Sequence, residues 1–232
     1  MAYYDRYRPA STLVLVLTVL LATDIVLSVA GAGSEWLQIQ LLDEAASGIA
    51  IDDDRATAND LRESLIGIAQ FGVNILMAIL FLVWIHRANK NARVLGARDM
   101  EFTPGWSVGY FFVPIANLFK PYQAVKEIWK ASNPEGTHDW RQAPASPILG
   151  LWWASWLLRN ILGQIAFRSA WHAQSVSEMQ IATWINFWSD FFEIPAAVLV
   201  LLVIRGIHTM QENKFANLGD IPEVLPADDY GG

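Results

Sequence analysis

Long apolar runs separated by polar segments dominate the chain. Three of them have the roughly 20 mostly apolar residues that a helix needs to cross a hydrocarbon core of about 30 Å. They are Ser11 to Gly31, Ile66 to Ile85 and Ile181 to Ile204. A fourth run, Ser146 to Phe167, is equally long but carries Arg159 in its middle. This pattern predicts an all-α polytopic membrane protein with four transmembrane helices.

A shorter apolar run, Gly105 to Phe119, is interrupted by Pro114 and is too short for an ordinary span. Cytoplasmic loops of membrane proteins collect Lys and Arg, so the charge distribution can decide whether this run crosses. If it does not cross, twelve Lys and Arg residues lie on the side of the N-terminus and three on the other side. If it crosses, the division becomes seven to eight. The sequence therefore favours a re-entrant or interfacial segment, with both termini in the cytoplasm.

The segments around the spans complete the predicted layout. Residues 1–10 are a cytoplasmic tail, and residues 11–210 form a single membrane domain with an acidic outside loop at 32–65. Within that loop, Thr57 to Asp60 resembles a capping box that starts the helix of the second span. Residues 211–232 contain acids and turn residues without an apolar period, which predicts a disordered cytoplasmic tail.

The cytoplasmic region 102–132 continues from the short apolar run into an amphipathic segment. Pro121 to Ser132 places Val125, Ile128 and Trp129 on one helical face, with charged side chains on the other. Such a helix lies in the membrane interface, where its Lys side chains are near anionic lipid. The residues predicted to form an interaction surface in this region are Trp106, Pro114, Asn117, Pro121, Lys126, Trp129 and Lys130.

Composition removes several classes of function. The chain is 53% hydrophobic and 17% charged, which is less charge than a soluble domain carries. It contains no Cys, which excludes disulfides and thiolate chemistry. Its net charge of −7 provides no basic surface for nucleic acid. The four His residues are scattered, so we expect no metal site and no cofactor.

Ionisable and amide side chains inside the predicted spans form the strongest functional signal. Such groups are costly in a membrane, usually face the bundle interior, and mark functional sites by default. At a rise of 1.5 Å per residue they fall between the membrane centre and the outer leaflet. We therefore predict one intramembrane polar cluster, consisting of Asp24, Gln70, Asn74, Arg159, Asp190 and Glu193. It is either a site for an ion, proton or polar solute, or a buried network that fixes helix register.

A second motif, Gly105 to Gly109, matches the G-x-S-x-G pattern of serine hydrolases. A nucleophile elbow needs a strand before the serine, and the sequence predicts none. Intramembrane proteolysis needs only Ser and His on adjacent helices, and His86 and His208 lie at the same predicted membrane face as Ser107. Short motifs often match by chance, so hydrolysis ranks as a distant third interpretation and we predict that the protein is not an enzyme.

The order of three segments resembles a known family. Phe81 to Ala97 is followed by Phe102 to Ser132, with its run P-G-W…P-I-A-N-L…P-Y-Q…I-W, and then by Leu149 to Leu158. This order resembles domain-of-unknown-function family 4328, over about residues 60–210. The resemblance implies a multi-pass protein of the bacterial inner membrane. It carries over no activity, cofactor or catalytic residue.

Two functional classes therefore stay open from the sequence. The first is a non-catalytic membrane scaffold or regulatory protein that interacts through region 102–132. The second is a pathway for a small solute, ion or proton through the polar cluster. The predicted partners are the lipid bilayer and other membrane proteins or further copies of the chain as a homo-oligomer. We favour the scaffold, because inverted repeats and paired broken helices, which are usual in transporters, are not visible.

Overall fold

The computed structural model describes residues 6–134 and 139–219, and these form helices and connecting segments without a strand. The helices are α1 (Ser11–Ala46), α2 (Asp53–Val94), α3 (Pro104–Gly109), the 3-10 helix η1 (Ala116–Leu118), α4 (Lys120–Ser132), the 3-10 helix η2 (Trp140–Gln142), α5 (Ile148–His172) and α6 (Val176–Gly219). The all-α prediction is therefore confirmed.

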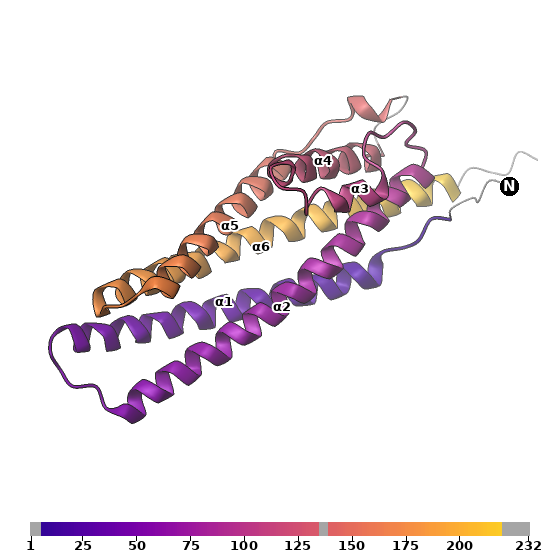
Figure 1. The fold of residues 1–232 in the computed structure, drawn as a ribbon. Helices are drawn as coiled ribbons and strands as arrows, with labels where there is room; N and C mark the ends of the chain where they lie inside the picture. Colours follow the sequence, from indigo (N-terminus) through magenta and orange to yellow (C-terminus); the bar gives the residue numbers. More distant parts are fainter. Residues whose placement is uncertain (1–5, 135–138, 220–232) are drawn as a thin grey trace, which may run out of the picture.

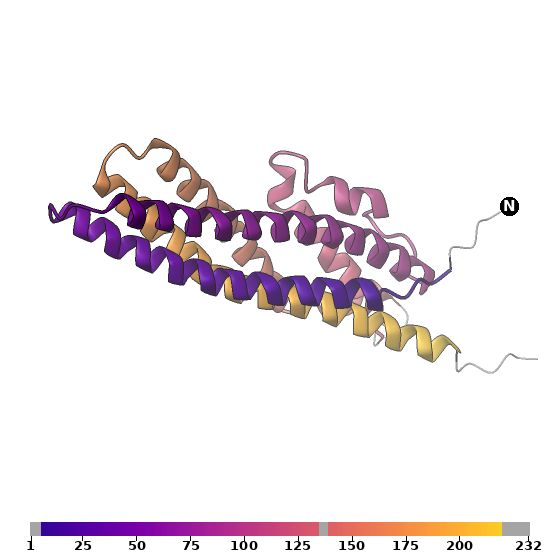
Figure 2. The same cartoon turned by 90° about the horizontal axis from the view of Figure 1, so that it is seen from below.

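Four long helices lie side by side in the spatial order α2, α1, α6, α5. The α1–α2 and α5–α6 connections lie at one end, which we call the hairpin end (Figures 1 and 2). The described N-terminal residues, the C-terminal part of α6, α3 and α4 lie toward the opposite end, the terminal end (Figure 1). α1 packs mainly on α2 and α6, and α5 packs mainly on α6.

Three of the described helices are long and apolar enough to cross a membrane. They are α1, α2 and residues Val176–Leu218 of α6. α2 has 42 residues and is therefore about 63 Å long, roughly twice the thickness of a hydrocarbon core. α2 is consequently longer than a single membrane crossing requires.

The two ends of α2 show why the helix is longer than its apolar run. The predicted capping box at Thr57 to Asp60 is wrong, because α2 begins four residues before Thr57, at Asp53. Asp53 and Asp54 occupy its first turn, where negative charge interacts favourably with the helix dipole. At the other end, Gly96 adopts φ 99°, a left-handed conformation that glycine adopts without strain and that commonly ends helices.

Two segments outside the predicted spans are largely or partly helical. In the acidic segment 32–65, predicted as an outside loop that contains the start of the second span's helix, α1 continues to Ala46 and leaves only a short connection to α2. Its helix-forming residues pack on the neighbouring helices rather than standing free, as buried Ile39 and Leu42 show. The predicted disordered tail is also wrong for its first part, since α6 continues to Gly219. The remainder of that prediction, residues 220–232, lies outside the described residues.

Region 102–132 folds into short elements at the terminal end. Thr103 caps α3 by accepting a hydrogen bond from the Trp106 backbone, and Pro104 opens the helix. Tight turns and η1 follow, and Ile115 has φ 66°, which is unusual for a β-branched residue. α4 then occupies the place of the predicted amphipathic helix, with Ile128 buried.

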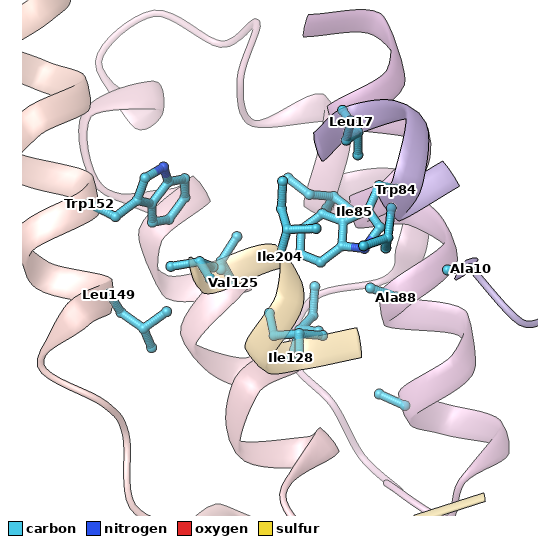
Figure 3. Packing of buried hydrophobic residues seen from close by; sticks show 14 of the residues in the cluster. Ala10, Leu17, Trp84, Ile85, Ala88, Val125, Ile128, Leu149, Trp152 and Ile204 are labelled. Atoms are coloured by element: carbon cyan, nitrogen blue, oxygen red, sulfur yellow. The ribbon is translucent and has the colours of Figure 1, made fainter. Parts of the chain in front are cut away.

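The apolar core lies where α4 meets the long helices at the terminal end. Val125 and Ile128 of α4 converge on Ile204 of α6 and Trp84 of α2, as Figure 3 shows. Each of these side chains is almost fully buried. Burial of such side chains contributes about 1.5–3 kcal/mol apiece, so this core fixes α4 against the bundle.

Candidate functional site

Arg159 of α5 lies at the centre of a polar cluster midway along the bundle. Its guanidinium forms an ion pair with Glu193 of α6 and donates a hydrogen bond to the side-chain carbonyl of Asn74 in α2. The Asn74 amide in turn donates to Asp24 Oδ1 of α1 at 3.2 Å. One asparagine therefore connects the arginine of α5 to the carboxylate of α1.

A second pair lies one helical turn nearer the hairpin end. Gln70 Nε2 lies 3.1 and 3.2 Å from the two carboxylate oxygens of Asp190. The Asn74 amide also donates to the Gln70 backbone carbonyl at 2.9 Å, which joins the two parts of the cluster. The structure thus brings all six predicted cluster residues together.

Gly31 of α1 is a member of this site that the sequence prediction missed. A Cβ at this position would collide with the Asp190 carboxylate and lie 2.8 Å from Gln70 Nε2. Glycine therefore lets side chains of α2 and α6 reach the α1 backbone. The available signal was spacing, since Gly31 follows Asp24 by seven residues, two helical turns along the same face.

A groove of about 1090 Å³ lies beside the cluster, between α2 and α5. The four-helix bundle is therefore not closed, because the described parts of α2 and α5 do not pack extensively on each other. α1 and α6 form the floor of the groove, where Arg159, Asp190 and Glu193 are among its lining residues. Most of the other lining residues are apolar.

Aromatic side chains close the groove toward the terminal end. Phe111, from the turn after α3, packs edge-on between Phe81 of α2 and Trp156 of α5, with ring centroids 6.2 and 6.3 Å away. Trp153 of α5 donates a hydrogen bond to the Leu118 carbonyl at 2.9 Å and so ties the same segment to α5. Region 102–132 consequently acts as the end wall of the groove.

The predicted interaction surface of region 102–132 does not lie on one exposed face. Trp106 and Pro114 are exposed, whereas Pro121 is buried. Trp129 is half-buried and packs so closely on α6 that a Cβ at Gly206 would lie 2.7 Å from its ring. The other three residues are half-buried, namely Asn117, Lys126 and Lys130. Helix periodicity defines a face but not which partner covers it, and here α6 covers part of that face.

Ser107, the serine of the G-x-S-x-G pattern, is fully buried in a hydrogen-bond network. Its hydroxyl donates to the Thr103 carbonyl at 3.0 Å and accepts from Asn89 Nδ2 at 2.9 Å. Asn89 also donates to the Phe102 carbonyl at 2.9 Å. These bonds hold α3 against α2, and they give Ser107 a structural role.

Buried amides at the terminal end form a second group that the sequence prediction did not single out. Gln211 of α6 donates to the Ala88 carbonyl at 2.8 Å and to Ser132 Oγ at 2.9 Å. Asn91 donates to the Arg8 carbonyl at 2.9 Å. The signal available in the sequence was Asn and Gln within otherwise apolar faces of α2 and α6.

At the terminal end, a partly buried carboxylate connects α4 to the segment before α3. Glu127 of α4 accepts hydrogen bonds from the backbone amides of Glu101 and Phe102 at 2.6 and 3.0 Å. Burial raises the pKa of its carboxyl, and these two bonds only partly oppose the rise. Over residues 6–134 and 139–219, no group of three or more His, Cys, Asp or Glu side chains is arranged to hold a metal ion.

Comparison with known proteins gives a family but no activity. No curated protein and no solved structure matches the chain. The family described as Domain of unknown function (DUF4328) matches residues 47–209, which include α2, the whole of region 102–132, α5 and most of α6. The segments that carry the resemblance also build the end wall and both sides of the groove. On this match, the chain belongs to the DUF4328 family.

Proposed function

We propose that the protein is a four-span protein of the bacterial inner membrane, with its terminal end in the cytoplasm. The fourth span is α5, which packs along α6 and runs antiparallel to it. Because α5 lies alongside α6, it crosses the same part of the membrane as α6 does. The twelve-to-three distribution of Lys and Arg favours the cytoplasmic placement of the terminal end.

Within that arrangement, the function that the geometry favours is non-catalytic binding of a lipid-like amphiphile. The observation that carries this proposal is the groove between α2 and α5. Its volume of about 1090 Å³ suits a molecule of lipid or drug size. Because its open side lies between two helices that face the hydrocarbon, molecules dissolved in the bilayer reach it without crossing water.

The lining of the groove matches an amphiphile in length and polarity. Along α5 it extends from Trp152 to Arg168, a rise of about 24 Å. Apolar side chains such as Phe71 and Phe167 form most of its walls and suit a hydrocarbon chain. About a third of the Arg159 side chain is exposed there, so a polar group of the ligand has a charged partner at the floor.

The segment after α3, which closes the groove, also presents an apolar surface at the terminal end. After Phe111, the turn exposes a run of apolar side chains: Phe112, Val113, Ile115, Leu118 and Phe119. In the proposed topology this surface meets the inner leaflet. The segment from Phe111 to Phe119 therefore forms both the end wall of the groove and the membrane-facing surface. A ligand in the groove would change the position of this segment, and a partner protein that binds the segment would sense that change. This links the scaffold or regulatory role to ligand binding.

Filling the groove tests the proposal. Gly163 lines the groove and has space around its Cα, whereas Gly150 lies on the same helix, also in open space, but does not line the groove. We expect Gly163→Trp to weaken binding of a fluorescent long-chain fatty acid at least tenfold, and Gly150→Trp to leave it unchanged. The measurement is a titration of purified protein in detergent, followed by fluorescence. Absence of saturable binding by the unmodified protein, or equal binding by both variants, would overturn the proposal.

A further inference from the structure

Asp24 has one carboxylate oxygen whose hydrogen bonding is incomplete. The residue is 1% exposed, and while Oδ1 accepts from Asn74, Oδ2 has no hydrogen-bond partner among the residues that the structure describes. A buried polar atom without a partner costs free energy and calls for an explanation such as a bound ion or water. The site therefore lacks one donor at Asp24 Oδ2.

The carboxyl group of Glu193 lies within hydrogen-bonding reach of Asp24. Two ionised carboxylates only accept hydrogen bonds, so neither can satisfy the other. A proton on either carboxyl supplies the missing donor and forms an O–H···O bond between them. The proton adds to one carboxylate oxygen, and no other bond changes.

The charges around the pair also favour a bound proton. Beside the pair, Asp190 of α6 adds a third carboxyl and Arg159 of α5 adds a positive charge. Nearer the hairpin end, Glu35 of α1 and Glu63 of α2 add two carboxyls, and Arg62 of α2 lies 3.5 Å from Glu63. Of these described groups, five are carboxyls and two are arginines, and Arg62 is paired with Glu63, so the carboxyls stay in excess around Arg159. A metal ion is the less favoured ligand, because the described residues form no acidic or histidine group of suitable geometry.

Polar residues connect this pair to the hairpin end but not to the terminal end. Toward the hairpin end, Ser28, Ser34 and Glu35 are buried on the inner face of α1, and Glu35 Oε2 also has no partner among the described residues. Ser34 is hydrogen-bonded to Glu63 and Arg62 of α2. Toward the terminal end, Leu21 and Leu17 are fully buried within the apolar core. Along the inner face of α1, a proton therefore has buried polar partners toward the hairpin end and apolar side chains toward the terminal end.

We propose that Asp24 and Glu193 form a binding site for one exchangeable proton, which enters from the hairpin end of the bundle. Glu193 is also the ion-pair partner of Arg159, so a proton carried by Glu193, rather than by Asp24, removes the charged counterion of Arg159 at the floor of the groove. This inference does not depend on the groove binding a ligand.

Infrared difference spectroscopy of the protein in lipid vesicles tests the site. We expect a carbonyl band of a protonated carboxyl group to appear on acidification. Glu193→Gln and Asp24→Asn should each abolish the band. Glu178→Gln, on the same helix but in its exposed first turn, should retain it. Glu193→Asp, which keeps a carboxyl group, should retain a shifted band even if a neutral variant fails to fold.

Sidedness is tested in sealed vesicles selected for an outward-facing hairpin end. Acidifying only the outer solution should produce the band, and acidifying only the inner solution should not. The proposal is overturned if the band is missing from the unmodified protein, persists in both neutral variants, disappears in Glu178→Gln, or responds equally to both sides.

Discussion

The terminal end and the middle of the bundle both bury polar side chains, but they do so in opposite ways. At the terminal end the buried groups are mainly amides and hydroxyls, and Asn89 and Gln211 each donate two hydrogen bonds. In the middle the buried groups are charged, and Asp24 retains an oxygen without a partner among the described residues. Neutral groups with complete hydrogen bonding stabilise a fold at low electrostatic cost. An excess of buried carboxyls is better explained by binding.

The largest effect is expected from removing the one cation of the cluster. Arg159→Met leaves Glu193 without its counterion and Asn74 without a donor, which should destabilise the protein by about 3 kcal/mol. The measurement is thermal unfolding in detergent. Arg168→Met is the matched control, since Arg168 is exposed on the same helix, and a surface change of this kind is expected to stay within about 0.5 kcal/mol.

The double variant Arg159→Met with Glu193→Gln sharpens this result. If the ion pair explains the loss, removing both charges should recover most of the stability, because no unpaired charge remains at Glu193. Equal destabilisation by the single and the double variant would mean that packing of the arginine, rather than its charge, stabilises the middle of the bundle.

At the terminal end we expect a smaller loss from Asn89→Ala. This change removes two donated bonds and the acceptor of Arg93 Nε, and it leaves buried groups unsatisfied, at a cost of about 2 kcal/mol. Ser107→Ala should cost about 1 kcal/mol, because it removes one member of the same network. Chemical unfolding of both variants measures whether Asn89→Ala loses more stability than Ser107→Ala. If Asn89→Ala lowered the free energy of unfolding as much as Arg159→Met, the proposed difference between the neutral network and the charged cluster would be contradicted.

The contact between α4 and α6 provides a steric test of the terminal end. Gly206→Ala places a methyl group against the Trp129 ring, and such overpacking costs about 1–3 kcal/mol unless the ring shifts. Gly67→Ala is the control, because nothing lies within 4 Å of an added Cβ there and alanine is the better helix former. Thermal unfolding should show a loss for the first variant and none for the second. Equal stability of the two would mean that α4 is only loosely held.

The smallest effect concerns pH. Since the folded-state pKa of Glu127 is raised above its unfolded value, ionisation of this carboxyl is disfavoured in the folded state. Its contribution to the free energy of unfolding is therefore most favourable below the unfolded pKa and declines as pH rises through the folded pKa. Glu127→Gln should flatten this part of the stability profile. The check is unfolding at a series of pH values, and an unchanged profile would contradict the burial argument.

The sequence alone predicted an all-α chain with helices long and apolar enough to cross a membrane, and it identified the six polar side chains that the structure brings together. Apolar length predicts helices that can cross a bilayer, and a constant rise per residue gives the depth of each polar group. These two rules placed the polar groups between the membrane centre and the outer leaflet, and the structure joins Asp24, Asn74, Arg159 and Glu193 through side-chain contacts. The same sequence did not reveal where the helices end, because the charge of Asp53 in the first turn and the left-handed backbone of Gly96 act locally, beyond the apolar run.

Only the tertiary structure decided which helices are neighbours. Periodicity identifies an inward face, but it does not determine which element covers that face, and so it gave no indication that α2 and α5 stay apart. For the same reason it could not show that Pro121 is buried while Trp106 is exposed. The groove and the approach of Asp24 to Glu193 arise from packing between segments far apart in the chain, because contact between helices depends on the shapes of all their side chains together.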